Sequence, residues 1–175
     1  MIVSDDNNRA SATLRVLDIV EGTSVDGPGL RTSVYLAGCT HHCEGCHNPE
    51  SWDPTQGTVY TVDELYNKIE DAGMNVTFSG GDPLLQAPAL IELVERLVEE
   101  GGFHVWCYTG YTFEEVAADT SLNPILRWID VLVDGPFVLS RRDTSLLFRG
   151  SGNQRLVDVA RWRQTGEITC WTPEF

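Results

Sequence analysis

Positive charge is scarce in this sequence. Lysine and arginine together number 12 against 26 aspartates and glutamates, which gives a net charge of −14, and Lys68 is the single lysine. A surface of that sign repels the phosphate backbones of DNA and RNA. We therefore expect no direct binding to nucleic acid.

Long hydrophobic runs are also missing. The chain has no stretch of about 18 apolar residues, the length that a membrane-spanning helix requires. The first residues, MIVSDDNNRASATLRV, lack the basic and then apolar layout of a signal peptide. We expect a flexible polar tail over residues 1–12 and one domain over residues 13–175, located in the cytoplasm without contact to a membrane.

Cysteines are few and their number is odd. The chain has five, and a disulfide framework is not expected in the cytoplasm. Three of them stand in the stretch CTHHCEGCHNP at 39–49, as Cys39, Cys43 and Cys46, whereas Cys107 and Cys170 are isolated. Thiolates at this spacing can converge on one soft metal centre from a single loop, so metal chemistry explains the group better than coincidence or pairing.

Two kinds of metal centre fit three clustered cysteines. A structural zinc needs a fourth ligand, which His41, His42 or His47 can supply, although zinc sites usually have two separated ligand pairs. A cubane iron–sulfur cluster normally takes four cysteines. With three, one iron has no protein ligand, and an open position of this kind admits a substrate or a cofactor.

Short apolar segments alternate with amphipathic ones along the chain. The segments that predict buried strands are residues 32–37, 75–79, 103–108 and 129–133. Thr61 with Glu64, and Thr112 with Glu115, have the spacing of a capping box at the start of a helix. A third helix has an apolar stripe from Leu90 to Val98, and residues 122–128 suit one or two further helical turns.

This alternation predicts an α/β fold with a parallel sheet covered by helices. The chain is too short for eight βα units, so we expect a partial, open parallel β/α barrel or a curved open sheet. The cysteine loop, SGGDP at 79–83, YTGY at 108–111 and DGPF at 134–137 each follow a predicted strand. The carboxyl ends of parallel strands share one edge, so these four loops should form one site.

The spacing C-x3-C-x2-C after the first parallel strand resembles the signature of the radical S-adenosylmethionine enzymes. The stretch Gly80-Gly81-Asp82 is similar to the glycine-rich GGE motif of that superfamily. The resemblance implies a 4Fe–4S cluster held by Cys39, Cys43 and Cys46. It also implies that S-adenosylmethionine binds the open iron and is cleaved by reduction to methionine and a 5′-deoxyadenosyl radical.

Within the superfamily, the chain resembles the activating proteins of anaerobic ribonucleoside-triphosphate reductase over residues 14–157. The matching motifs are DGPG at 26–29 with Arg31, the cysteine loop over 38–48, SGGDP at 79–83, YTGY at 108–111, VLVDG at 131–135, and FRGS at 148–151 with Asn153 and Gln154. The resemblance implies an oxidoreductase that generates a glycyl radical near the C-terminus of the reductase, with an electron donor such as flavodoxin.

The resemblance also implies the residues that contact the cofactor. They are Gly45, Cys46, His47, Ser79, Gly80, Gly81, Asp82, Thr109 and Asp134. Asp82 with Pro83 can equally open a helix, and Asp134 with Gly135 can form a simple turn. His41, His42 and His47 are expected to be loop or packing residues and not metal ligands, and Cys107 a small core residue. Arg31, Arg149 and Arg155 either bind an anion or pair with surface acids.

Other functions compete with this interpretation. One is an activator of a different glycyl-radical enzyme, and another is a small-molecule radical enzyme such as the deazaguanine-forming synthase. The stretch 148–154 and the absence of a ferredoxin-like insert favour the reductase activator over both. A non-catalytic zinc module is the alternative from a different class.

Overall fold

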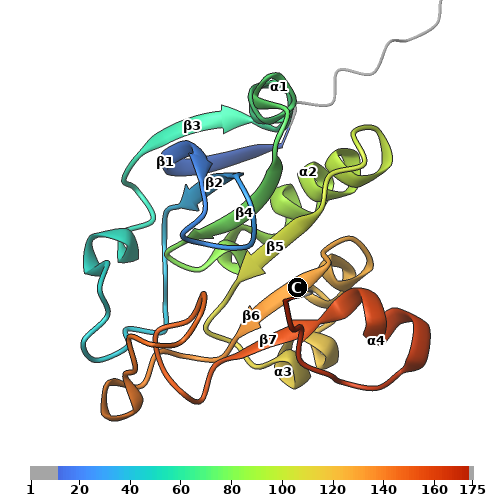
Figure 1. Cartoon of the computed structure of the whole chain (residues 1–175). Coiled ribbons are helices and arrows are strands. Elements are labelled where there is room, and N and C mark those ends of the chain that lie inside the picture. The colour runs from blue at the N-terminus through green and yellow to red at the C-terminus, as the bar shows by residue number, and fades with distance from the viewer. Residues whose placement is uncertain (1–11, 174–175) are drawn as a thin grey trace, which may run out of the picture.

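The computed structural model describes residues 12–173, so the predicted tail over residues 1–12 lies outside it except for Ala12. The described residues form one sheet in the order β3-β1-β2-β4-β5-β6-β7 (Figure 1). The strands are β1 Thr13–Thr23, β2 Arg31–Leu36, β3 Thr58–Thr61, β4 Asn75–Gly80, β5 Val105–Tyr108, β6 Val131–Asp134 and β7 Arg155–Asp158. No helix of the described part is long and apolar enough to cross a membrane.

The four predicted strands are the parallel centre of the sheet. β2, β4, β5 and β6 pair in parallel, with Val34 beside Phe78, Phe78 beside Cys107, and Cys107 beside Leu132. The sequence predicted their positions to within two residues because each is a short, mostly buried segment rich in apolar residues.

The predicted parallel sheet is found in the centre, whereas both edges are antiparallel. β1 pairs antiparallel with β2 and with β3, and β7 pairs antiparallel with β6. The physical reason is the connections: the loop over residues 24–30 and the loop over residues 135–154 return the chain without a crossover helix, as antiparallel neighbours allow. The fold is therefore α/β with a mixed, mainly parallel sheet.

The capping boxes are confirmed. α1 is Val62–Ala72, and Thr61 accepts a hydrogen bond from the Glu64 backbone while the Glu64 carboxylate accepts one from the Thr61 backbone. α3 is Phe113–Ala118, with the same reciprocal bonds between Thr112 and Glu115. The other α-helices are α2 Ala87–Glu99 and α4 Val159–Thr165, and the short 3-10 helices are η1 Pro49–Trp52, η2 Pro83–Gln86, η3 Asn123–Arg127 and η4 Leu139–Arg141.

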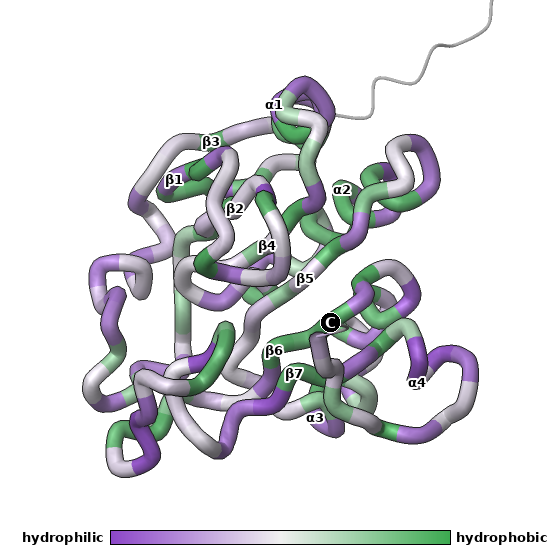
Figure 2. Tube along the Cα trace, viewed as in Figure 1, coloured by the Kyte–Doolittle hydropathy of each residue, from purple (hydrophilic) through white to green (hydrophobic). Residues whose placement is uncertain are grey.

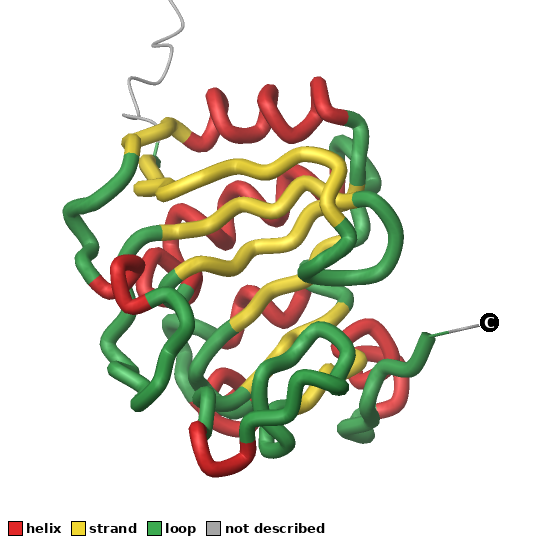
Figure 3. Tube along the Cα trace, turned by 60° about the vertical axis from the view of Figure 1, so that its left-hand side comes forward, coloured by secondary structure: helices red, strands yellow, loops and turns green. Residues whose placement is uncertain are grey.

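The helices cover one face of the sheet (Figure 3). Alternate strand residues, among them Val34, Phe78 and Leu132, pack there against α1 and α2 in the main hydrophobic core. Cys107 belongs to this core, as predicted, and its complete burial raises the pKa of its thiol. Hydrophobic residues follow the central strands, which are largely green in Figure 2.

The opposite face carries a smaller aromatic core. The ring of Trp106 from β5 makes edge-on contacts with Phe148 and Trp171, at centroid distances of 5.4 and 4.9 Å. Trp171 reaches it because the backbone NH of Trp171 donates to the carbonyl of Leu156 in β7, 2.7 Å away. The segment that contains Cys170 and Trp171 thus packs along edge strand β7.

Arg31 lies inside the fold, and no carboxylate among residues 12–173 is within ion-pair distance of it. It is 1% exposed, and its guanidinium donates to the Thr77 hydroxyl at 2.8 Å and to the carbonyls of Val76 and His104 at 2.6 and 3.0 Å. Burial lowers its pKa to about 10. Pairing with surface acids, one of its two predicted roles, is not observed among the described residues; Arg31 instead ties the start of β2 to β4 and to His104, just before β5.

Candidate functional site

The cysteine loop begins where β2 ends. Backbone NH groups of Gly38 and Cys39 donate to the carbonyls of Ser51 and Trp52 at 2.8 and 3.2 Å, so η1 anchors the base of the loop. The NH of Cys46 donates to the carbonyl of Cys43 at 3.1 Å and closes a turn between these two cysteines. This local geometry brings three thiols from a short stretch of chain to one side of the loop.

Cys39, Cys43 and Cys46 are free, partly exposed, and line one pocket at the carboxyl edge of the parallel strands. Five other predicted residues line the same pocket: His47, Ser79, Gly80, Gly81 and Thr109. They come from the ends of β4 and β5 and from the cysteine loop. The structure therefore brings together the loops that the sequence analysis expected to form one site.

Two glycines let the end of β4 approach the cysteine loop closely. A Cβ on Gly80 would lie 2.5 Å from the backbone N and O of Leu36, and a Cβ on Gly81 would lie 2.3 Å from the carbonyl oxygen of Gly38. No side chain fits at either position without moving the backbone. The glycine pair thus forms a close-packed wall beside the thiols.

The donor set fits an iron–sulfur cluster. Three thiols on one loop are soft ligands, and no disulfide ties any of them. In the described part of the chain, no three His, Cys, Asp or Glu side chains converge as tightly as a single metal ion requires. A cubane binds each thiolate through a different iron, so its ligands stand farther apart than those of one ion. Burial raises the pKa of the Cys39 thiol, so binding of iron would have to displace its proton.

Asp82 is buried next to the pocket and joins three loops: the cysteine loop, its own loop after β4 and the loop after β5. Its side chain is 2% exposed, and its carboxylate accepts hydrogen bonds from the backbone NH of Leu84 at 2.9 Å and of Gly110 at 3.0 Å. It also accepts from the Thr109 hydroxyl at 2.9 Å and from Nε2 of His41 at 2.6 Å. This bond raises the pKa of His41. Asp82 caps η2, as the helix-opening interpretation expected, and also fixes the cysteine loop.

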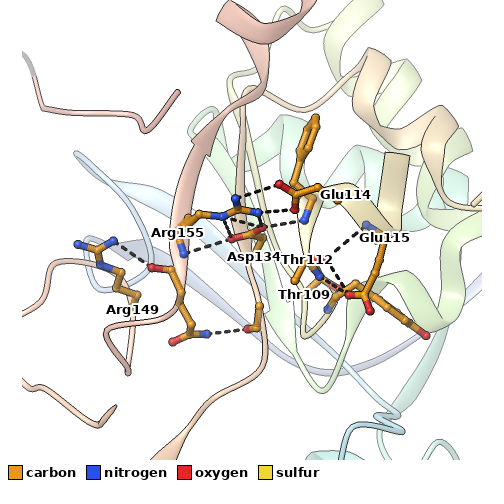
Figure 4. Close-up of polar contacts among 11 residues, drawn as sticks. Thr109, Thr112, Glu114, Glu115, Asp134, Arg149 and Arg155 are labelled. Atoms are coloured by element: carbon orange, nitrogen blue, oxygen red, sulfur yellow. Dashed lines mark hydrogen bonds and ion pairs between the residues drawn. The ribbon is translucent and has the colours of Figure 1, made fainter. Parts of the chain in front are cut away.

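Asp134 is likewise held by internal partners (Figure 4). Its carboxylate is 1% exposed and accepts from the backbone NH of Phe113 at 2.7 Å and from the guanidinium of Arg155. Arg155 also bonds the carboxylate of Glu114 at 2.7 Å. The bond to Asp134 raises the pKa of Arg155, and Arg155 lowers that of Glu114. Of the two predicted roles for Arg155, pairing with acids is the one observed.

Neither Asp82 nor Asp134 lines the pocket in this structure, and Gly45 lines a neighbouring hollow instead. Several residues that do line it were not among the predicted cofactor contacts: His41, Trp52, Tyr108, Gly110, Gly135, Phe137 and Gln154. Tyr108, Gly110, Gly135 and Gln154 belong to motifs already noted, so strand-end position alone could have identified them. Phe137 ends the DGPF stretch that was also noted, whereas nothing in the sequence marks Trp52.

His41 and His42 pack against aromatic rings, as expected. The ring of His41 meets Tyr111 edge-on at 4.6 Å, and that of His42 meets Trp52 at 4.7 Å. His47 differs, because it lines both the cysteine pocket and the adjoining hollow.

The motif over residues 148–154 organises the loop beside the pocket. The Gln154 side-chain oxygen accepts from the backbone NH of Gly150 and Ser151, while its amide donates to the Gly135 carbonyl. The Asn153 amide donates to the carbonyl of Pro136 at 2.8 Å. Residues 135–154 are therefore closed at their base by side-chain bonds.

Comparison with known proteins agrees with this site. The family described as "4Fe-4S single cluster domain" matches residues 25–157. The anaerobic ribonucleoside-triphosphate reductase-activating protein of Escherichia coli K12 is 37% identical over 139 residues, covering 74% of this chain and 89% of that protein. Those of Vibrio cholerae and of bacteriophage T4 are 38% and 36% identical, covering 74% and 75% of this chain and 88% and 86% of theirs.

Among solved structures, QueE from Escherichia coli matches with a TM-score of 0.48 and 19% identity, covering 57% of this chain and 54% of that one. The similarity to the activating proteins is far higher and extends over most of both partners. By that similarity and by its cysteine loop, the chain belongs to the family of anaerobic ribonucleoside-triphosphate reductase-activating proteins, which carry a 4Fe–4S cluster domain.

Proposed function

We propose that this protein activates an anaerobic ribonucleoside-triphosphate reductase by generating its glycyl radical, with S-adenosylmethionine as cosubstrate. The observation that carries the proposal is the placement of Cys39, Cys43 and Cys46. These three thiols share one pocket with a backbone wall of glycines, in a chain 37% identical to a named activating protein. Three ligands leave one iron of a cubane open.

The chain's own residues hold and orient the reactants. Cys39, Cys43 and Cys46 would each bind one iron. A cluster held by these residues would supply the electron for reductive cleavage of S-adenosylmethionine, which gives methionine and a 5′-deoxyadenosyl radical. Backbone groups of Ser79, Gly80 and Gly81, which line the same pocket as the thiols, would then lie against the methionine part.

We assign the remaining contacts to the pocket and to the loops around it. Gly45, Cys46 and His47 lie on the side proposed for the adenine, and Thr109 lies at the end of β5. Asp82 and Asp134 complete the proposed set, although both carboxylates already accept internal hydrogen bonds. A direct contact with the cofactor would replace one of these internal hydrogen bonds. We therefore propose that the main role of both aspartates is to hold the loops around the pocket in place.

The finer features of the proposal concern architecture and partners. We propose that the mixed sheet curves into a partial, open barrel and that residues 13–175 form one domain. An open side suits a protein substrate, because a loop that carries the target glycine can itself exclude water from the radical. We propose that this target is the glycine loop near the C-terminus of the reductase. A flavodoxin-like protein would donate the electron in the cytoplasm.

The test starts with the protein reconstituted with iron and sulfide under anaerobic conditions. We expect a brown protein with about four irons per chain. On reduction it should cleave S-adenosylmethionine, and mixing with the reductase should give a glycyl-radical signal by electron paramagnetic resonance. Cys43→Ala should lose cluster and activity, whereas Cys170→Ser, a change at an exposed cysteine outside the pocket, should keep both.

Two results would contradict the proposal. Colourless protein that holds one zinc would indicate the non-catalytic zinc module. Cleavage of S-adenosylmethionine without any radical on the reductase, but with turnover of a small molecule, would indicate the small-molecule radical enzyme.

A further inference from the structure

The loop beside the pocket has a charge opposite to that of the whole chain. Residues 136–154 contain Arg141, Arg142 and Arg149 and only one acid, Asp143, in a protein with a net charge of −14. The Asp143 carboxylate is engaged by the backbone NH and the hydroxyl of Ser145, at 2.9 and 2.6 Å. Among residues 12–173, none of the three arginines has a carboxylate within ion-pair distance.

A hollow of about 470 Å³ lies between this loop and the cysteine loop. Arg142, Arg149 and the Ser145-bonded Asp143 line it from one side, and Gly45 and His47 from the other. The two loops are in close contact, because a Cβ on Gly45 would lie 2.8 Å from a methyl carbon of Leu139. In Figure 1 they meet as the orange loop that carries η4 and the light-blue segment after β2.

Phe137 connects the hollow to the cysteine pocket. Its side chain lines both, and it also lines a third hollow with Glu44 and Leu139. A chain segment lying in the arginine-lined hollow would therefore pass Phe137 on its way to the thiols. Leu139 and Leu147 on the same loop are 44% and 57% exposed, which offers apolar contact on either side of the charges.

The loop is held rigid before any partner arrives. Gln154 and Asn153 close its base, as described above, and the Tyr108 hydroxyl donates to the Phe148 carbonyl at 2.7 Å. The Ser151 hydroxyl accepts from the backbone NH of Val138 at 3.1 Å. A surface fixed in this way loses little conformational entropy when it binds, which favours docking of an extended segment.

We propose that the loop over residues 137–150 is the docking surface for an acidic, extended segment of the protein substrate. Arginine binds carboxylates through paired hydrogen bonds, so Arg141 and Arg142 would select aspartate or glutamate side chains. The surface would direct the segment past Phe137 to the pocket. This inference rests on the proposed function, since it names the chemistry of the partner that the activase recognises.

The test compares two double variants with the same change in net charge. Arg141→Glu with Arg142→Glu reverses the docking surface; Arg127→Glu with Arg161→Glu reverses two exposed arginines elsewhere. Cleavage of S-adenosylmethionine by reductant alone, without reductase, should be the same in all three proteins. The rate of glycyl-radical formation is then measured against reductase concentration. We expect the KM for the reductase to rise tenfold or more in the docking variant and less than threefold in the control.

Ionic strength provides a second readout. The wild-type KM should rise with added sodium chloride, because the salt screens the ion pairs, and the docking variant should lose this dependence. Equal KM values in the two double variants would overturn the proposal. A second contradicting result would be that inorganic triphosphate binds the wild type and not the docking variant, while both have the same KM for the reductase. The surface would then be a site for small anions. Failure of the wild type to cleave S-adenosylmethionine would instead refute the proposed function itself.

Discussion

Replacement of Asp82 by asparagine is the substitution for which the structure gives the clearest magnitude. The carboxylate accepts from Leu84, Thr109, Gly110 and His41 and is 2% exposed. Asparagine of the same size keeps one acceptor oxygen and turns the other into a donor. Whichever way the amide is placed, at least one buried NH then faces an NH2 group.

The cost follows from the groups left without partners. One buried donor without an acceptor costs about 1–3 kcal/mol, and the remaining bonds lose the strengthening that an ionised acceptor provides, about 1 kcal/mol in total. We therefore expect Asp82→Asn to lower the free energy of unfolding by about 2–4 kcal/mol. For a chain of this length that is a fall in Tm of about 4–16 °C.

Urea denaturation of the metal-free protein, followed by circular dichroism, measures this free energy without interference from the cluster. Asp143→Asn is the matched control. Its carboxylate also accepts a backbone NH and a hydroxyl, but Asp143 is exposed, so a change within about 0.5 kcal/mol is expected. A loss for Asp82→Asn no larger than that of the control would refute the view that Asp82 joins the three loops.

Three further predictions concern stability. Trp171→Ala should cost about 3 kcal/mol in urea denaturation, because the ring packs against Trp106 from the C-terminal segment; an unchanged midpoint would show that this segment does not pack there. Arg31→Met should cost about 2–4 kcal/mol by the same assay, because it leaves the buried carbonyls that Arg31 binds without a donor, whereas Arg161→Met should be near neutral. Burial, with the hydrogen bond to Asp26, raises the pKa of Tyr35 to about 12. The unfolded chain loses this proton near pH 10 and the folded chain near pH 12, so the free energy of unfolding should decrease as the pH rises from about 10 to about 12. In Tyr35→Phe the decrease should be smaller. Equal decreases in the two proteins would contradict the assignment.

Local signals in the sequence predicted much of the fold. Thr61 with Glu64, and Thr112 with Glu115, specify helix starts through contacts only three residues apart, and both are found. The parallel strands were identified because they are continuous apolar runs. β1 was not, because only one of its faces is buried and polar residues interrupt its pattern.

The interior polar contacts could not be predicted in the same way. Asp82 has partners from the cysteine loop and from the loop after β5, separated from it by 41 and 27 residues along the chain. Asp134 is paired with Arg155 across the antiparallel β6 and β7. Such pairings depend on the register of the strands and on the path of the loops that connect them, and a short stretch of sequence encodes neither.

The thiols of the site were identified from their spacing alone, whereas the surrounding pocket depends on the three-dimensional fold. Phe137 and Trp52 line it because the loop over residues 135–154 and η1 happen to reach the same edge. A sequence motif can name ligands on one loop, but the residues that several distant loops contribute require the structure.

The central claim is that the protein supplies three ligands to the cluster and leaves one iron open. Electron paramagnetic resonance of the reduced, reconstituted protein, recorded before and after addition of S-adenosylmethionine, measures this most directly. We predict that the g values of the cluster shift when the cofactor is added, in the wild type and equally in a His47→Ala variant. A spectrum that does not change on addition of S-adenosylmethionine, or a cluster whose fourth iron is already bound by a side chain, would contradict the account.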